Sequence, residues 1–184
     1  MNFPIQVDEK TILRPLVLDD AETMFALIQQ NRTHLDTRLR WSGRIQSVAD
    51  AQALIKRFAD KLALNDGFHA GLWQAETLIG GVVCHYINPE GRKSEIGYWL
   101  GESFIGQGII TNACKAVISA LIREENVHRI EIQCMVNNAR SRAVPERLGF
   151  MYEGIKRQSE WINGAFADHA VYSLLDREWR YGVR

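Results

Sequence analysis

Two glycines at a junction between a strand and a helix form the first arrangement in this chain that suits chemistry. The run Gly106-Gln-Gly108 follows the alternating stretch Glu95–Leu100 and precedes a stretch with helical periodicity that continues to Ile122. Glycine allows positive φ and lets another group approach the backbone closely. The first N–H groups of a helix have no intrahelical partner and lie at the positive end of its dipole. The junction therefore predicts a main-chain cradle for an anion such as a pyrophosphate.

The spacing around these glycines differs from that of the two familiar nucleotide-binding loops. A P-loop requires Gly-Lys-Ser/Thr, whereas Gly108 is followed by two isoleucines. A dinucleotide fingerprint requires a third glycine where Thr111 stands and an acid at the end of the next strand, but Glu131 lies inside that strand. A tight structural connection remains the alternative to an anion site.

Hydrophobic periodicity predicts the elements that position this junction, since apolar residues alternate in strands and repeat at i, i+3 and i+4 in helices. The predicted strands are Thr11–Pro15, Phe68–Trp73, Leu78–Ile87, Glu95–Leu100, Arg129–Val136, Glu153–Ile162 and Phe166–Leu175, the last two joined by a hairpin turn at Asn163-Gly164. The predicted helices start near Asp20, Ser47, Gly108 and Ala139, and the last one ends at Gly149. This order predicts an α/β fold: a mixed central sheet with helices on both faces and a right-handed parallel crossover.

Local signals refine this outline. Asp19–Glu22 and Ser47–Asp50 both resemble capping boxes, in which a short polar residue caps the helix start and an acid follows three residues later. Gly80-Gly81 inside a strand predicts a bulge. The polar and basic segment 31–44 is predicted to be a solvated loop between helices, anchored by Trp41.

The composition limits the class of protein. A chain of 184 residues predicts one domain, 1–184. Its 22 basic and 22 acidic residues balance, so we expect neither a general nucleic-acid partner nor a membrane surface. No run approaches the ~20 apolar residues of a membrane helix, and the N-terminus lacks the pattern of a signal peptide. Cys84, Cys114 and Cys134 are far apart, which predicts reduced, buried residues of a cytoplasmic protein and no metal site.

A second motif gives the chain a family resemblance. Asn138-Ala-Arg-Ser141 follows a predicted strand, and Leu148-Gly-Phe150 and Glu153-Gly154 come shortly after it. This run is similar to Asn-x-x-Ser…Leu-Gly-Phe-x-x-Glu-Gly of the GNAT superfamily, particularly the RimJ/RimL-type ribosomal-protein N-terminal acetyltransferases. Those enzymes also carry a Gly-x-Gly-Ile loop one strand and one helix upstream. The resemblance covers Ile12 to Leu175 and implies the acyl-CoA N-acyltransferase (GNAT) fold.

The resemblance implies acetyl-CoA as the acetyl donor and a set of cofactor-binding residues. Main-chain amides of Trp99 and Leu100 would pair with the pantetheine arm, and Asn138 would hold the thioester end. The family's pyrophosphate loop corresponds to Ile105, Gly106, Gln107, Gly108, Ile109 and Ile110.

The resemblance also implies the catalytic groups. Ile105 stands where the family usually has Gln or Arg, a small departure because backbone N–H groups capture phosphate with many side chains. Pro145 stands where the family often has the tyrosine that protonates the CoA thiolate. Ser141, one turn earlier, then takes the role of acid, and Glu160 before the final hairpin takes the role of base. His85, Glu95 and His169 are the reserve bases.

The acceptor is an amine whose identity the residues leave open. An α-amine has a pKa near ~8, against ~10.4 for lysine, so it asks less of a base. The resemblance favours the N-terminus of a ribosomal protein; a small-molecule amine and a non-catalytic acyl-CoA-binding module are the alternatives. The family and the apolar fraction of 46% also lead us to expect a homodimer.

Overall fold

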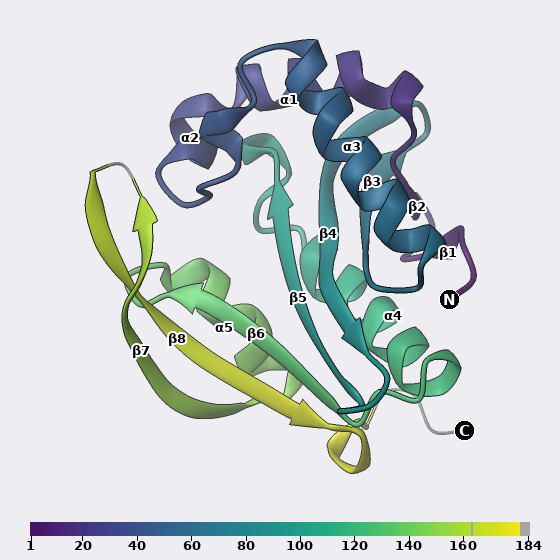
Figure 1. Cartoon of the computed structure of the whole chain (residues 1–184), viewed down its shortest axis with the longest axis vertical. Coiled ribbons are helices and arrows are strands. Elements are labelled where there is room, and N and C mark those ends of the chain that lie inside the picture. Colours follow the sequence, from purple (N-terminus) through teal and green to yellow (C-terminus); the bar gives the residue numbers. More distant parts are fainter. Residues whose placement is uncertain (163, 181–184) are drawn as a thin grey trace.

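In the residues that the computed structural model describes, 1–162 and 164–180, eight strands form one sheet in the order β1-β2-β3-β4-β5-β6-β8-β7 (Figure 1). The strands are β1 (Ile5–Gln6), β2 (Thr11–Pro15), β3 (Phe68–Gln74), β4 (Thr77–Asn88), β5 (Lys93–Leu100), β6 (Arg129–Met135), β7 (Met151–Ile162) and β8 (Ala165–Leu175). The helices are α1 (Ala21–Gln30), α2 (Arg32–Asp36), α3 (Val48–Ala63), α4 (Ile109–Glu124) and α5 (Ala139–Leu148). Within these residues no helix is long and apolar enough to cross a membrane.

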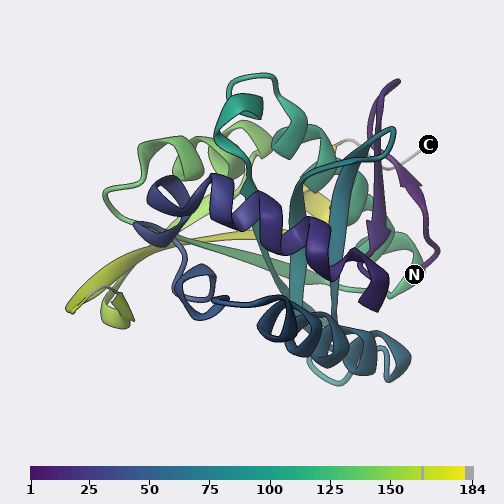
Figure 2. The same ribbon diagram turned by 90° about the horizontal axis from the view of Figure 1, so that it is seen from above.

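Helices cover both faces of the sheet, which confirms the predicted mixed α/β class. Neighbouring strand residues point to opposite faces. Leu72 therefore packs in the layer that contains α4 and α5, while Trp73 packs in the layer that contains α1 and α3. Figures 1 and 2 show these helix pairs on opposite sides of the sheet.

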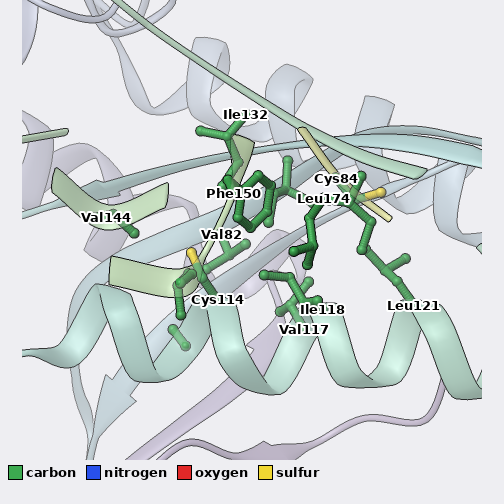
Figure 3. Close-up of a cluster of buried hydrophobic side chains, with 14 of the residues drawn as sticks. Val82, Cys84, Cys114, Val117, Ile118, Leu121, Ile132, Val144, Phe150 and Leu174 are labelled. Carbon is green, nitrogen blue, oxygen red and sulfur yellow. The ribbon is translucent and has the colours of Figure 1, made fainter. Parts of the chain in front are cut away.

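Helix α4 is the centre of the larger core layer. Its apolar face meets strand residues such as Val82, Ile132 and Leu174, and Phe150 closes the same cluster (Figure 3). Of the predicted helical face, Ala116 is only partly buried, and the buried residues of α4 are Ile109, Ala113, Cys114, Val117, Ile118, Ala120 and Leu121. Each large side chain buried in this way stabilises the fold by about 1.5–3 kcal/mol, so α4 is held firmly against the sheet.

The sheet is antiparallel except where β5 and β6 pair in parallel through the α4 crossover, as predicted. These two strands pair only at Lys93–Arg129, Ser94–Ile130 and Glu95–Glu131. Beyond Glu95 and Glu131 they separate, and Figure 1 shows them diverging. We call the opening between their separated halves the wedge.

A bulge in β4 lies opposite the point where the wedge opens. Cys84 pairs with Ile96 and Tyr86 pairs with Glu95, so His85 is an extra residue. Because bulges bend a strand and increase its twist, this one turns β5 away from β6. The bulge predicted at Gly80-Gly81 lies one residue earlier, on the side of β4 that pairs with β3. Leu72 pairs with Gly80 and Trp73 pairs with Leu78, so Ile79 is the unpaired bulge residue.

The segment 31–44 differs from the predicted solvated loop. It contains α2 and a 3₁₀ turn, Ser42–Arg44, and it buries Leu35 in the second core layer. Two polar contacts fold it back: Ser42 Oγ donates to Asp36 at 2.7 Å, and Arg32 donates to the Ile45 carbonyl at 2.7 Å. Arg32, Asp36 and Ser42 therefore use their side chains to fold the segment back on itself rather than to face solvent.

One of the two predicted capping boxes is wrong. The predicted cap, Asp19, lies inside a 3₁₀ turn (Leu18–Asp20), and the N-cap of α1 is Asp20, which makes no side-chain cap. The Asp20 carboxylate instead accepts two hydrogen bonds from Arg14, at 2.7 and 2.9 Å, and one from the Val17 amide at 2.9 Å. A guanidinium within reach outcompetes the helix amides for this carboxylate. Ser47 caps α3 through the Asp50 amide as predicted, and Gly149 ends α5 with φ +83°.

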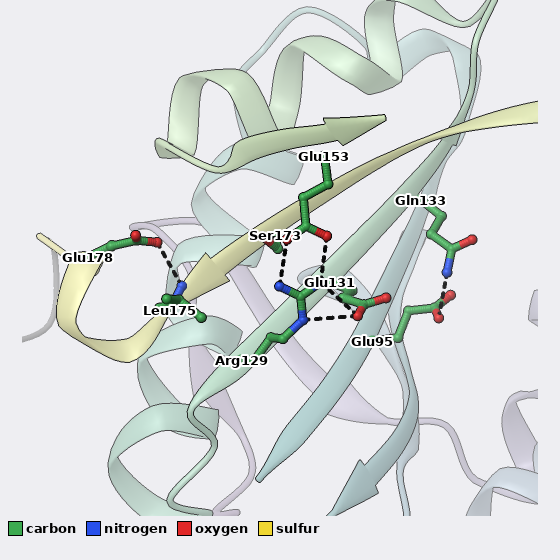
Figure 4. A network of polar contacts seen from close by, with 8 residues as sticks. All are labelled: Glu95, Arg129, Glu131, Gln133, Glu153, Ser173, Leu175 and Glu178. Atoms are coloured by element: carbon green, nitrogen blue, oxygen red, sulfur yellow. Dashed lines mark hydrogen bonds and ion pairs between the residues drawn. The ribbon is translucent and has the colours of Figure 1, made fainter. Parts of the chain in front are cut away.

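Strands β7 and β8 form the predicted terminal hairpin, in which Ile162 pairs with Ala165. Asn163 of the predicted turn lies outside the described residues. A polar network ties the hairpin to β6 (Figure 4). Arg129 donates to both carboxylate oxygens of Glu153, at 2.7 and 2.6 Å, and Ser173 donates to the same carboxylate at 2.7 Å. This paired geometry holds the pKa of Glu153 at about 2.

We predict that Glu153→Gln destabilises the protein by about 1 kcal/mol at neutral pH, the upper range for a partly exposed ion pair. The folded state lowers the pKa of Glu153 below its ordinary value of 4.5, so the ion pair contributes fully above pH 4.5. The contribution is lost as the pH falls towards 2. Denaturant unfolding at several pH values measures this change against Glu90→Gln, which removes the same charge from an exposed turn. A difference between the two variants that does not depend on pH would contradict the assignment.

Candidate active site

A cavity of about 940 Å³ occupies the wedge and extends along the helix start and the final hairpin. It is lined by residues from β5, β6, the loop before α4, α5, the segment 34–41 and the hairpin β7–β8. Among the described residues, no group of His, Cys, Asp or Glu is arranged to hold a metal ion.

The glycine loop forms one wall of the cavity. Gly106 and Gly108 have φ of +86° and +77°, and a Cβ added at either position would meet nothing within 4 Å. Gly108 is the N-cap of α4 and offers no side-chain cap, so the amides of Ile109, Ile110 and Thr111 have no intrahelical acceptor. Free amides, a positive helix end and open space together suit an anion.

Five of the six loop residues predicted for the cofactor line the cavity: Ile105, Gly106, Gly108, Ile109 and Ile110. Gln107 is the exception, because its side-chain amide donates to the Ser103 carbonyl at 3.3 Å and it is not among the lining residues. Only its main chain remains part of the loop.

The main chain of β5 forms a second wall. Gly101 donates to the Ile79 carbonyl of β4 at 2.8 Å, and main-chain groups of antiparallel strands alternate in direction. Trp99 therefore directs its amide to β4, while Tyr98 and Leu100 direct theirs into the wedge. The Trp99 amide is thus bonded within the sheet and is not free for a pantetheine arm, whereas the pairing of the Leu100 amide with that arm stays a prediction.

Ser141 lies where α5 crosses the wedge. Its Oγ lies 3.2 Å from Cys134 Sγ of β6 and 3.3 Å from the Tyr98 hydroxyl of β5, and its single hydrogen can be donated to one or the other of these acceptors. The Tyr98 hydroxyl donates in turn to the Ser141 carbonyl at 2.8 Å. Burial raises the pKa of both Tyr98 and Cys134, so these two groups stay protonated at neutral pH. Ser141 thus faces two neutral acceptors in the cavity.

Asn138 has a structural contact in addition to its place in the cavity wall. Its side-chain oxygen accepts the Ser141 amide at 3.2 Å and caps α5. The residue that the family resemblance places at the thioester therefore also fixes the helix start that carries Ser141.

Glu160 enters the cavity from β7 and is bonded to a histidine of β8. Its Oε2 lies 3.2 Å from His169 Nε2, and His169 Nδ1 lies 2.9 Å from Ser159 Oγ. A carboxylate only accepts, so Nε2 carries a hydrogen in this contact. The hydrogen bond from His169 lowers the pKa of Glu160 below its ordinary value, although partial burial opposes the shift. Glu160 is therefore ionised at neutral pH.

Two of the reserve bases lie on the floor of the wedge. Glu95 is half-buried and accepts a hydrogen bond from Gln133 at 2.9 Å (Figure 4), and burial raises its pKa. His85, the bulge residue, also lines the cavity beside Gly97, where an added Cβ would lie 3.0 Å from its Nε2. Loss of solvent around the ring lowers the pKa of His85.

The sequence did not single out three of these polar groups, Tyr98, Gln133 and Ser159. Tyr98 and Gln133 occupy ordinary positions in alternating strands, where their types alone indicate nothing about function. Tyr98 and Gln133 lie just after the last paired residues of β5 and β6, a position that only the strand pairing shows.

Comparisons with known proteins agree with the geometry. The sequence model of a family described as "Acetyltransferase (GNAT) domain" matches residues 10–151. The chain is 38% identical to the putative ribosomal N-acetyltransferase YdaF of Bacillus subtilis, over 96% of this chain and 97% of that protein. It is 32% identical to the ribosomal-protein-serine acetyltransferase of Escherichia coli, over 95% and 98%. The structure of RimL, a ribosomal L7/L12 alpha-N-protein acetyltransferase in complex with coenzyme A, superposes with a TM-score of 0.90 at 26% identity, covering 94% and 98%.

We predict that Gly108→Asp weakens acetyl-CoA binding at least tenfold more than Gly108→Asn. Asn and Asp both tolerate positive φ and have nearly the same shape, so the pair differs only in charge. The added carboxylate would repel a pyrophosphate held by the first amides of α4. Calorimetric Kd values at two salt concentrations measure the difference, which should shrink as salt screens it. Equal Kd values for the two folded variants would mean that the anion lies elsewhere.

Proposed function

The chain belongs to the acetyltransferase (GNAT) domain family and transfers an acetyl group from acetyl-CoA to an amine, and we propose that this amine is the N-terminal α-amine of a ribosomal protein. Family membership favours an enzyme over a non-catalytic acyl-CoA-binding module. The ribosomal acceptor is supported by the names of the two curated relatives, each of which is matched over nearly its full length.

One observation carries the proposal: a single cavity joins the groups that each stage of amine acetylation needs. The free amides of α4 suit the pyrophosphate, and the wedge-facing amides of Tyr98 and Leu100 suit an extended amide-containing arm. Ser141 and Glu160 line the same cavity from two different elements, α5 and β7. The donor thus has a binding wall, and the reacting centre has both a hydroxyl and a carboxylate.

Glu160 is the proposed base. Near neutral pH an α-amine with a pKa near ~8 is about one-tenth neutral, so the enzyme has to remove a proton held only weakly. The ionised Glu160 attracts the ammonium form into the cavity, and His169, which donates to this carboxylate from Nε2 at 3.2 Å, holds it in place. A lysine acceptor, with a pKa near ~10.4, would need a stronger base than a carboxylate whose pKa is lowered.

Ser141 is the proposed acid. When the amine attacks the acetyl carbonyl, the carbon–sulfur bond of the thioester breaks and the thiolate leaves with a negative charge. The Ser141 hydroxyl gives its proton to the sulfur, and the serine regains a proton from solvent. The proton lost by the amine passes to Glu160 and from there to solvent, so the products are a neutral amide and a neutral thiol. The neutral Cys134 and Tyr98 beside it add no competing charge.

We also propose that the protein is a homodimer and acts in the cytoplasm. Strand β7 is an edge of the sheet, and the large apolar side chains exposed on the hairpin are Met151, Tyr152, Ile155, Trp161 and Phe166. Exposed apolar groups on an edge strand favour pairing with another chain. The three free cysteines suit a reducing compartment, where ribosomal proteins are also made.

We predict that wild-type enzyme releases free thiol from acetyl-CoA with a peptide copying a ribosomal protein N-terminus, but not with the same peptide already N-acetylated. Glu160→Gln should lower kcat by ~10²-fold near neutral pH, with partial recovery as the pH approaches the pKa of the amine. Ser141→Ala should lower kcat with little change in acetyl-CoA affinity, and the double variant should lose less than the product of the two losses.

Activity with small amines and none with peptides would instead assign the enzyme a small-molecule acceptor. Wild-type kcat in Glu160→Gln at every pH would exclude that carboxylate as the base and point to Glu95 or His85.

We predict that light scattering at micromolar concentration gives the dimer mass, and that Ile155→Lys on β7 shifts it towards the monomer. Leu64→Lys is the matched control, because Leu64 is also an exposed apolar residue but lies beyond the end of α3. A monomer mass for the wild type, or an equal shift in both variants, would contradict the proposed interface.

A further inference from the structure

Helix α5 contains a proline at the position that decides which group bonds to Ser141. In an unbroken α-helix the amide of residue 145 donates to the carbonyl of residue 141. Pro145 has no amide hydrogen, so the Ser141 carbonyl is released from the helix ladder. A buried or half-buried carbonyl needs another donor.

Tyr98 supplies that donor from a different element. Its hydroxyl, carried on β5, donates to the released Ser141 carbonyl at 2.8 Å. With its only hydrogen committed there, the Tyr98 oxygen can act only as an acceptor towards Ser141 Oγ, which lies 3.3 Å away. Cys134 Sγ of β6 is the second acceptor, at 3.2 Å. The Ser141 hydroxyl therefore lies between two acceptors, and no described neighbour in this cluster donates to it.

We propose that Tyr98 and Pro145 together form a positioning pair for Ser141: the proline frees the carbonyl, and the tyrosine binds it and holds the serine hydroxyl as a donor facing the wedge. The inference rests on the proposed role of Ser141 as the acid. Tyr98 gives up no proton in the reaction, because its hydroxyl hydrogen stays on the tyrosine oxygen and is donated to the Ser141 carbonyl. The proton available to the departing sulfur is that of Ser141.

The geometry also explains why the two residues are needed as a pair. With an ordinary residue at 145, the helix amide would occupy the carbonyl, and the Tyr98 hydroxyl would be free to donate to Ser141 Oγ. The serine would still have its own hydrogen. However, Ser141 Oγ would then accept a hydrogen bond from Tyr98, so its hydroxyl would no longer be oriented only by groups that accept from it. Pro145 thereby determines the direction of the hydrogen bond between Tyr98 and Ser141.

A set of variants separates two effects: the contribution of the hydrogen bond on the Ser141 carbonyl to Tm, and the contribution of the position of the Ser141 hydroxyl to kcat. Tyr98→Phe should lower kcat about tenfold, the value of one lost hydrogen bond, with KM for acetyl-CoA unchanged. It should also lower Tm by about 3 °C, because the Ser141 carbonyl loses its donor. Adding Pro145→Ala restores a helix amide to that carbonyl, so the double variant should regain the Tm of the wild type while kcat stays low.

Two further measurements complete the test. The pH dependence of kcat in Tyr98→Phe should match that of the wild type, since Tyr98 transfers no proton. Combining Tyr98→Phe with Ser141→Ala should give the kcat of Ser141→Ala alone, because Tyr98 acts through Ser141. Tyr86→Phe on the adjacent strand β4 is the matched control; Tyr86 is not among the residues that line the cavity, and kcat should be unchanged.

Several results would overturn the proposal. Recovery of kcat together with Tm in Tyr98→Phe/Pro145→Ala would make Tyr98 a purely structural donor. Three results would each exclude positioning through Ser141. The first is a wild-type kcat in Tyr98→Phe, and the second is a change in the high-pH part of its kcat profile. The third is a kcat loss in Tyr98→Phe/Ser141→Ala that equals the product of the two single losses. Wild-type kcat in Ser141→Ala would instead refute the proposed acid, and the Tm of the Tyr98 and Pro145 variants would then still decide whether the carbonyl bond exists.

Discussion

The separation of β5 from β6 is the constraint on which the functional half of the molecule depends. Parallel strands pair through evenly spaced main-chain bonds, and here that pairing stops after Glu95 and Glu131. The cause lies in the neighbouring strand, where the extra residue His85 bends β4 opposite the last paired positions. Everything beyond that point on β5 and β6 has a side that no strand covers, and the cavity occupies this side.

Where the sheet is interrupted, main-chain N–H and C=O groups need other hydrogen-bond partners, because unpaired polar groups are costly when shielded from water. Side chains bridge the narrow end of the wedge, where Gln133 of β6 donates to Glu95 of β5. Tyr98 and Ser141 bridge the wider part through α5. The remaining amides, those of Tyr98 and Leu100, face the opening and suit an extended ligand that adds to β5 as a further strand would.

The same wedge gives its two carboxylates opposite electrostatic surroundings. Burial raises the pKa of Glu95 at the floor, whereas His169 lowers the pKa of Glu160 nearer the rim. A carboxylate kept ionised near the entrance attracts a cationic amine. The arrangement favours an acceptor that arrives protonated and leaves neutral.

The sequence by itself determined the features that depend on near neighbours in the chain. Helical periodicity identified α4, the two glycines marked its open N-terminus, and Ser47 and Gly149 marked helix ends, because caps and positive φ involve only a few consecutive residues.

The tertiary structure alone decided the features that depend on pairing between distant segments. Strand register turned the Trp99 amide to β4 rather than into the wedge. At the start of α1 the capping box expected at Asp19 does not form, and the carboxylate of Asp20 binds Arg14. Likewise, Pro145 could be read in the sequence as a missing helix donor, but only the packing of β5 against α5 showed that Tyr98 replaces it. Hydrogen bonds of this kind join residues more than 40 positions apart, and no local pattern of residue types specifies which strand position faces which helix turn.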